Sequence, residues 1–263
     1  MVVNNTTSLD SVCTCQACNH DFALDCIDCA CCEEGTHSMV LDGMTVPDKQ
    51  VRIPAGSVTL EGDLYLGTTP GIVLFAHGSG SSRLSPRNKQ VAGTLQKAGL
   101  GTLLFDLLTK DEERIDEQTA HLRFDIGLLA DRLAAATDWL TRRAGNAKIG
   151  YFGASTGAAA ALVAAAKKQD IVRAVVSRGG RPDLAGLYLD KVRAPTLLIV
   201  GGNDYPVIGM NQEAFDKLKI KDKRLEIVQG ATHLFEEPGK LEAVARLARG
   251  WFECYLHGEV AHA

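Results

Sequence analysis

A serine framed by glycines, at residues 153–157, constrains the fold of this chain more than any other feature. The pentapeptide reads Gly-Ala-Ser-Thr-Gly, with Ser155 at its centre. The apolar run at residues 148–152 predicts a strand, and the alanine-rich residues 158–166 predict a helix. A serine between a strand and a helix, with glycine two residues to each side, is typical of a sharp turn that exposes a nucleophile. On the motif alone, a tight loop without a catalytic role stays open as an alternative.

Three histidines follow Ser155, and only one of them follows a predicted strand. His233 lies in the loop after a strand predicted at residues 224–228, whereas His257 and His262 lie at or beyond the end of the last predicted helix. A serine hydroxyl is a poor nucleophile unless a base accepts its proton. We therefore predict His233 as that base, and the competing interpretation is a loop histidine that caps the next helix.

Two aspartates compete to orient the histidine. Asp204 follows a buried strand predicted at residues 194–200, and open α/β sheets build their sites at such strand ends. Asp183 follows an earlier strand and begins a predicted helix. We predict Asp204 rather than Asp183 as the acid that holds the histidine tautomer.

A glycine-rich loop upstream is the predicted oxyanion hole. Residues 71–76 are almost uniformly apolar, as a central parallel strand should be, and residues 77–82 read His-Gly-Ser-Gly-Ser-Ser. Such a loop lets backbone amides converge on a developing negative charge. We predict the amides of Ser79 and Thr156 as the donors. A phosphate-binding loop is the alternative, but no Gly-Lys-Ser/Thr follows.

Two arginines follow the strand predicted at residues 171–176. Arg178 and Arg181 leave the strand end beside the predicted site, where a guanidinium could bind a carboxylate or phosphate. They are predicted to bind substrate, which would then be a small anionic ester. The alternative is that they only pair with acids of nearby loops: Asp106, Asp183, Glu236 and Glu237.

The alternation of predicted strands and helices indicates an α/β domain over residues 46–258, with eight mostly parallel strands and helices on both faces. Residues 51–66 predict a hairpin that turns near Glu61 and Gly62. A charged segment at residues 110–117 is expected as a loop that partly covers the site.

The connection between the strand ending at Val176 and the strand starting near Pro195 is short. Fewer than twenty residues intervene, so no cap domain is predicted. The net charge of −4 and the pI of about 6.0 argue against nucleic acid or an anionic membrane as a partner. The first residues do not read as a secretory signal, so a cytoplasmic protein is expected. No oligomeric state is predicted.

Four segments, residues 77–83, 153–157, 176–184 and 230–238, carry a family resemblance. They resemble the bacterial dienelactone hydrolase-like branch of the α/β-hydrolases, over about residues 50–255. The resemblance implies a serine hydrolase that cleaves small esters through an acyl-enzyme and needs no catalytic cofactor. Dienelactone hydrolases proper use a cysteine nucleophile where this chain has serine. A thioesterase, a peptidase and a non-catalytic binding module remain as alternatives.

The N-terminal residues 1–45 are outside that resemblance and hold seven of the eight cysteines. They include two Cys-x-x-Cys pairs, Cys15 with Cys18 and Cys26 with Cys29. In a cytosolic chain this spacing favours zinc over disulfides. We therefore predict a structural zinc site here, with a disordered tail or an unrelated upstream sequence as alternatives.

Overall fold

The computed structural model describes residues 13–15, 20–22, 40–41, 44–45 and 49–257. The chain divides into two compact units, residues 1–38 and 39–263. In the first unit, strand β1 (Cys13–Cys15) pairs antiparallel with β2 (His20–Phe22). The second unit starts with another short antiparallel pair, β3 (Val40–Leu41) and β4 (Met44–Thr45). The side chains of the predicted zinc site lie outside the described residues, so zinc binding stays a prediction.

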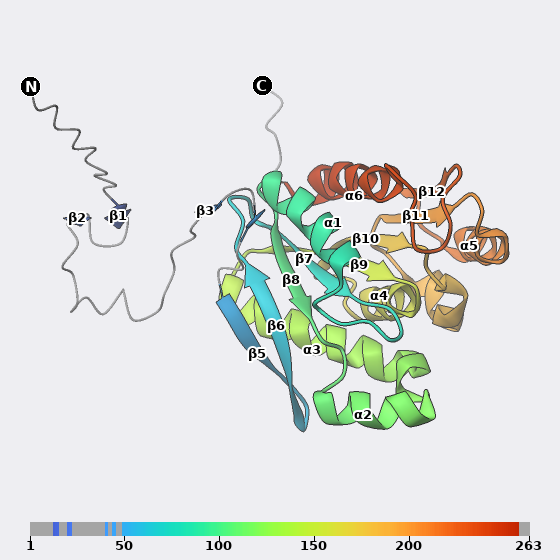
Figure 1. Cartoon of the computed structure of the whole chain (residues 1–263), viewed down its shortest axis with the longest axis horizontal. Coiled ribbons are helices and arrows are strands. Elements are labelled where there is room, and N and C mark those ends of the chain that lie inside the picture. Colours follow the sequence, from blue (N-terminus) through green and yellow to red (C-terminus); the bar gives the residue numbers. More distant parts are fainter. Residues whose placement is uncertain (1–12, 16–19, 23–39, 42–43, 46–48, 258–263) are drawn as a thin grey trace, which may run out of the picture. The chain divides into compact units, whose positions relative to one another are not determined.

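An eight-stranded sheet forms the centre of the second unit (Figure 1). Its order is β12-β11-β10-β9-β7-β8-β6-β5, parallel from β12 to β8, with β6 antiparallel to both β8 and β5. The strands are β5 (Lys49–Ala55), β6 (Val58–Tyr65), β7 (Gly71–Ala76), β8 (Gly101–Phe105), β9 (Lys148–Ala154), β10 (Val172–Arg178), β11 (Thr196–Gly201) and β12 (Lys223–Val228).

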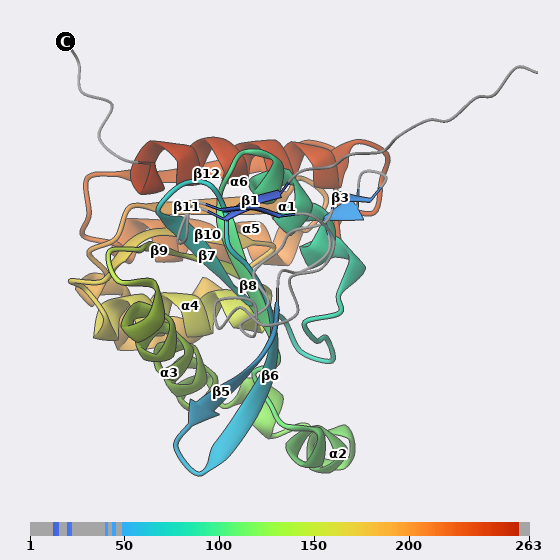
Figure 2. The ribbon, with the colours of Figure 1, turned by 90° about the vertical axis from the view of Figure 1, so that its left-hand side faces the viewer.

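Helices cover both faces of this sheet (Figures 1 and 2). One face carries α1 (Pro86–Lys97) and α6 (Lys240–Leu256), and these two helices contact each other. The opposite face carries α3 (Ile126–Ala144), α4 (Thr156–Lys167), α5 (Tyr205–Lys217) and the 3-10 segment η2 (Pro182–Lys191). A separate apolar core fills each side. The α/β-hydrolase fold without a cap domain is therefore confirmed, since η2 alone occupies the place where a cap would be inserted.

The predicted turn near Glu61 and Gly62 is wrong. The strands β5 and β6 turn at Gly56 and Ser57, where Gly56 has φ +68°. Gly62 instead lies inside β6, and a Cβ there would approach the Cβ of Phe105 to 3.0 Å. The glycine that suggested a turn permits close packing between β6 and β8.

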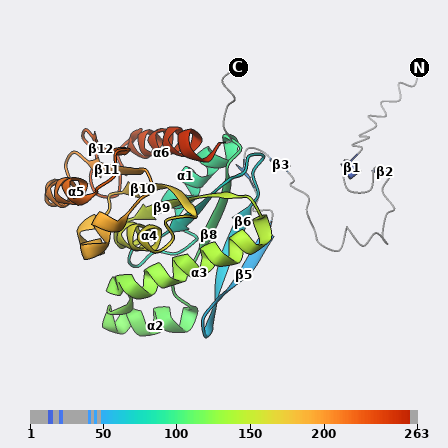
Figure 3. The same cartoon turned by 180° about the vertical axis from the view of Figure 1, so that it is seen from behind.

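The charged segment at residues 110–117 is a helix and not a loop. Helix α2 (Lys110–Thr119) begins with a capping box, in which the Thr109 hydroxyl accepts from the Glu112 amide and the Glu112 carboxylate accepts from the Thr109 amide. The short 3-10 segment η1 (Leu122–Phe124) connects α2 to α3. In Figure 3, α2 lies at the lower edge of the domain, below α3.

The order of the strands in the sheet indicates where a ligand would bind. β8 lies on one side of β7 and β9 on the other, so chain connections diverge at the carboxyl ends of β7 and β9. Ligands of open α/β sheets bind at such a point. Among residues 49–257, no helix has the length and apolar character needed to span a membrane.

Candidate active site

Ser155 occupies a strained turn between β9 and α4. Its φ and ψ are +51° and −121°, a region that residues with side chains rarely adopt. Glycine is required at both flanking positions because no space is left there for a side chain. A Cβ on Gly153 would lie 2.4 Å from the Ala158 Cα, and a Cβ on Gly157 would lie 2.2 Å from the Ala76 carbonyl oxygen. The predicted sharp turn is therefore present, with Ser155 half-buried at its tip.

The backbone that follows β10 holds this turn. The Ser155 amide donates to the Arg178 carbonyl at 3.3 Å, and the Arg181 amide donates to the Ser155 carbonyl at 3.1 Å. Gly179, between the two arginines, also adjoins the next loop, because a Cβ there would lie 2.9 Å from the His233 carbonyl oxygen. The residues after β10 thus contact both the serine turn and the histidine loop.

His233 and Asp204 are hydrogen-bonded to each other. The distance from His233 Nδ1 to Asp204 Oδ2 is 2.6 Å, across loops that follow β12 and β11. The Asp204 side chain is 12% exposed and the His233 side chain 36%. Because a carboxylate only accepts, His233 Nδ1–H is the donor, and in the neutral imidazole Nε2 then keeps its lone pair. That is the tautomer a general base needs.

Asp183, the competing candidate for the orienting acid, pairs with Arg181. Asp183 accepts two hydrogen bonds from Arg181, one from Nε at 2.9 Å and one from Nη2 at 2.8 Å. This pairing raises the pKa of Arg181 above its ordinary value. Arg181 therefore pairs with an acid of a nearby loop, as the alternative interpretation proposed. Asp183 forms no hydrogen bond or ion pair with His233, although both residues belong to the described part of the chain.

The predicted oxyanion loop lies directly against the serine turn. Gly78 packs on Ser155, since a Cβ on Gly78 would lie 3.0 Å from the Ser155 Cβ. The Ser79 hydroxyl is hydrogen-bonded to the Thr156 hydroxyl at 3.1 Å. The structure thus brings together the two residues whose amides are the predicted oxyanion donors.

His77, at the start of this loop, is a structural residue. Its Nδ1–H donates to the Gly78 carbonyl at 3.0 Å, and its Nε2 accepts from the Leu107 amide at 3.0 Å. Burial lowers the pKa of His77, against the opposing effects of the Gly78 carbonyl and of Asp106. A neutral imidazole therefore links the loop to the end of β8.

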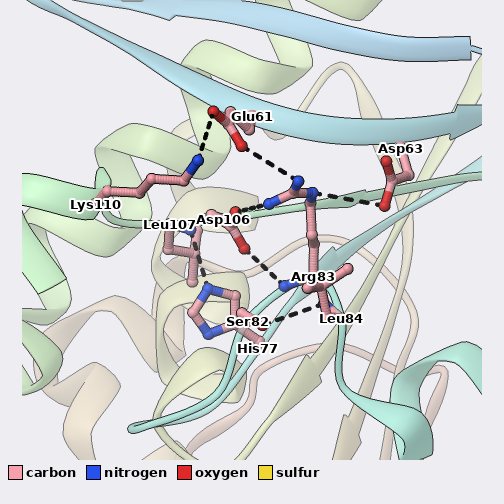
Figure 4. Close-up of polar contacts among 9 residues, drawn as sticks. All are labelled: Glu61, Asp63, His77, Ser82, Arg83, Leu84, Asp106, Leu107 and Lys110. Carbon is pink, nitrogen blue, oxygen red and sulfur yellow. Dashed lines mark hydrogen bonds and ion pairs between the residues drawn. The ribbon is translucent and has the colours of Figure 1, made fainter.

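Arg83 anchors the other end of the loop (Figure 4). Its guanidinium pairs with Asp106, with Glu61 at 3.2 Å and with Asp63 at 3.6 Å, and its amide donates to Asp106 at 2.7 Å. Lys110 extends the cluster through an ion pair of 3.3 Å to Glu61. These charges connect the oxyanion loop to β6, β8 and the start of α2.

Arg178 is a buried arginine with few polar contacts. Its side chain is buried, 5% exposed, between Asn88 and Phe235. One long hydrogen bond of 3.4 Å joins it to the Asn88 carbonyl oxygen, and its Nε has no partner among the described residues. Burial, together with nearby Arg87, lowers the pKa of Arg178 to about 10. The predicted binding of substrate by Arg178 and Arg181 stays a prediction.

A cavity of about 250 Å³ adjoins the oxyanion loop. One wall is residues 77–82 with Thr156, and the other comes from the end of β8, α2, η1 and α3. Its volume is below the roughly 300 Å³ at which pockets for drug-sized ligands begin, so it suits a small group. The residues from the second wall are Leu107, Leu108, Glu113, Asp116, Glu117, Arg123 and Leu129.

Residues 110–117, which were expected beside the site, do line this cavity, but their helical form and the parts of the wall from η1 and α3 were not predicted. One further contact was also missed. The pattern Thr109-x-x-Glu112 is a readable helix start that would have predicted α2. In the histidine loop, the Glu237 carboxylate accepts from the Thr232 amide at 3.0 Å, which lowers the pKa of Glu237. Glu237 thereby shapes the backbone next to His233, and no local motif indicates that role.

The fold and this site define an α/β-hydrolase whose cleft has no cap domain. The family model of the dienelactone hydrolase family matches residues 62–254. The chain therefore belongs to the dienelactone hydrolase family. A crystal structure of a dienelactone hydrolase from Anabaena variabilis is 61% identical in sequence, with a TM-score of 0.78. The match covers 80% of this chain and 98% of that one.

Two Mycobacterium tuberculosis proteins, from strains CDC 1551 and H37Rv, are 57% identical over 214 residues. Their names propose a phosphoribosyl transferase. The match covers 80% of this chain but only 47% of theirs, so the chain spans about half the length of these relatives. A lidless serine hydrolase from Xanthomonas campestris shares the fold, with a TM-score of 0.61 at 20% identity.

Proposed function

We propose that this hydrolase cleaves small carboxylic esters by a serine mechanism, with Ser155 as nucleophile, His233 as base and Asp204 as orienting acid. The observation that carries the proposal is the 2.6 Å contact between His233 Nδ1 and Asp204 Oδ2. It leaves Nε2 free to accept a proton, in a fold that also presents Ser155 on a strained turn. The chain order Ser, Asp, His is that of α/β-hydrolases.

In the proposed reaction, the Ser155 hydroxyl oxygen bonds to the ester carbonyl carbon while His233 Nε2 takes the hydroxyl proton. The amides of Ser79 and Thr156 stabilise the negative oxygen of the tetrahedral intermediate. The bond to the alcohol oxygen then breaks, and that oxygen leaves with the proton from His233. Water attacks the acyl-enzyme by the same route, which releases the carboxylic acid and restores Ser155.

The test is labelling and hydrolysis in matched variants. Ser155→Ala should abolish labelling by a fluorophosphonate probe and lower kcat for p-nitrophenyl acetate by roughly 10⁴-fold or more, because the nucleophile and its base act as one unit. Asp204→Asn should lower kcat by roughly 10³–10⁴-fold through the wrong histidine tautomer. The exposed Ser57 and His121 provide control variants, Ser57→Ala and His121→Gln, which should behave as the parent protein. Full activity in Ser155→Ala would refute the mechanism.

We expect oxyesters to be the preferred substrates, and the same residues could also cleave thioesters or peptides. A panel of acetyl oxyesters, thioesters and amides ranks these three by kcat/KM. The transferase activity in the names of the mycobacterial proteins refers to longer chains, of which the match covers 47%. Release of pyrophosphate from phosphoribosyl pyrophosphate by this chain would favour that activity over ester hydrolysis.

A further inference from the structure

The cavity beside the oxyanion loop has an acidic wall. Helix α2 contributes Glu113, Asp116 and Glu117 to it. Positions i, i+3 and i+4 lie on one face of a helix, so the three residues share the face of α2 that lines the cavity, and residues 77–82 line it too. A small ligand group that entered this cavity would lie between the oxyanion loop and these carboxylates.

One of the three negative charges is neutralised within the wall. Arg123 donates from Nε to the Asp116 carboxylate at 2.5 Å and from its amide at 3.0 Å, and a guanidinium nitrogen reaches the Asp116 carbonyl at 2.9 Å. These contacts lower the pKa of Asp116 against the effect of burial. Asp116 and Arg123 thus form a closed pair.

The other two carboxylates have no such partner. Within residues 49–257, no ion pair or hydrogen bond to the carboxylate of Glu113 or Glu117 is formed. Glu113 is the more buried of the two, and its pKa is raised by burial first and then by the negative charges of Asp106 and Glu117. Arg83 and Lys110 oppose this effect without cancelling it.

The helix dipole favours Glu113 in the first turn of α2, whereas its spacing from Glu117 opposes the helix. Like charges at i and i+4, as in Glu113 and Glu117, destabilise a helix. A half-buried carboxylate with a perturbed pKa in a cavity is more often found at functional sites than elsewhere. The cavity next to the proposed oxyanion hole offers such a function for Glu113.

We propose that Glu113 determines charge selectivity in the ester hydrolysis proposed above, so that the cavity accepts cationic groups best, neutral groups next and anionic groups least. The proposal rests on the role of Ser155. A negative charge at the wall of a small, partly desolvated cavity attracts a cation and repels an anion at close range. It reverses the anionic ester expected from Arg178 and Arg181, neither of which lines the cavity.

The test compares esters of similar shape and different charge. Acetylcholine and 3,3-dimethylbutyl acetate differ by one positive charge in the alcohol group. p-Nitrophenyl esters of 3-(trimethylammonio)propanoic acid, 4,4-dimethylpentanoic acid and succinic acid vary the acyl group in the same way. In Glu113→Gln, the ratio of kcat/KM for cationic to neutral ester should fall about tenfold in the series whose group enters the cavity, as expected for one charge at close range. The ratio for anionic to neutral ester should rise.

A matched control separates local from distant charge. Asp111 lies on the same helix, is paired with Arg114 and does not line the cavity. Asp111→Asn removes the same charge and should leave both ratios within twofold of the parent values. Selectivity unchanged in Glu113→Gln, with serine-dependent hydrolysis intact, would overturn this inference alone. Loss of the Ser155 requirement would instead overturn the proposed function.

The pH dependence gives a second readout. Since the pKa of Glu113 is raised, the carboxylate protonates at higher pH than an ordinary glutamate. Selectivity for the cationic ester should therefore be full at high pH and decline as the pH falls through this raised pKa. Glu113→Gln should show a flat ratio over the same range. An equal decline in both proteins would assign the effect to another group and contradict the role of Glu113.

Discussion

At the scale of single residues, the site combines strain with close packing. Ser155 is one of three residues other than glycine with positive φ in the described part of the chain, beside Ala120 and Phe235. Strain of this kind persists only where neighbours enforce it. Here Gly78 packs on the Ser155 side chain and the carbonyl of Arg178 fixes its amide. The turn therefore reduces folding stability in order to present a hydroxyl.

This strain predicts a gain in stability on replacing the proposed nucleophile. Ser155→Gly should raise the free energy of unfolding by about 1 kcal/mol, because glycine adopts φ near +51° without steric cost. Activity should be lost in the same variant. Urea denaturation measures the first and ester hydrolysis the second.

Ala120 provides the matched control, with φ +55° at the exposed end of α2. Ala120→Gly should also be stabilised, by up to about 1 kcal/mol, while it keeps its activity. A Ser155→Gly protein less stable than the parent would contradict the account of strain.

Residues whose role depends on local backbone requirements could be predicted from the sequence. Gly153 and Gly157 are needed wherever a strand turns sharply into a helix, and Asp204 follows a strand end. The burial of Arg178 could not be predicted. Arginine is ordinarily exposed, and Asn88 and Phe235, which enclose it, come from α1 and the loop before α6.

At the scale of elements, the oxyanion loop is held at both ends rather than by its own conformation. His77 links its start to Leu107, and Arg83 links its end to Asp106. Both contacts lead to the segment that follows β8. The loop position, and with it the predicted oxyanion donors, thus depends on the connection between β8 and α2.

This dependence predicts that Arg83 positions the loop. In Arg83→Met the guanidinium contacts with Asp106 are lost, and the loop at residues 78–82 should shift. A misplacement near 1 Å costs roughly 10²-fold in rate, so kcat should fall by about 10–100-fold with a smaller change in KM. Arg87→Gln is the control, because Arg87 pairs with the exposed Glu236 at the surface and should keep its kcat. Equal kcat values for Arg83→Met and the parent would rule out the positioning role.

Element prediction succeeded where apolar periodicity was strong and failed at α2. Strands such as β7 and β11 are buried throughout, almost entirely apolar, and each follows a proline. Helix α2 carries a single buried residue, Asp116, and nine of its ten positions are polar or charged, a composition that resembles a loop. Its stability comes from the capping box and from the ion pair between Glu112 and Arg132 of α3, which the composition alone does not reveal.

At the scale of the whole molecule, the residues proposed for catalysis and selectivity all belong to the unit formed by residues 39–263. The family model covers residues 62–254 of it. The dienelactone hydrolase from Anabaena variabilis matches over 98% of its own length with only 80% of this chain. That structure therefore has no counterpart for about a fifth of the present sequence.

The last prediction concerns the cysteine-rich residues 1–38. A shortened protein that begins at Met39 should keep kcat/KM for small esters within about twofold and its Tm within a few degrees, because the sheet begins at Lys49 and all proposed site residues follow it. If the predicted zinc site forms, elemental analysis should find about one zinc per full-length chain and none in the shortened protein, since four thiolates bind one ion. Replacing the four cysteines of the two Cys-x-x-Cys pairs by serine in the full-length chain is the control, and should remove zinc without affecting hydrolysis. A shortened protein that folds but hydrolyses esters more than tenfold more slowly would show that the N-terminal unit contributes to catalysis.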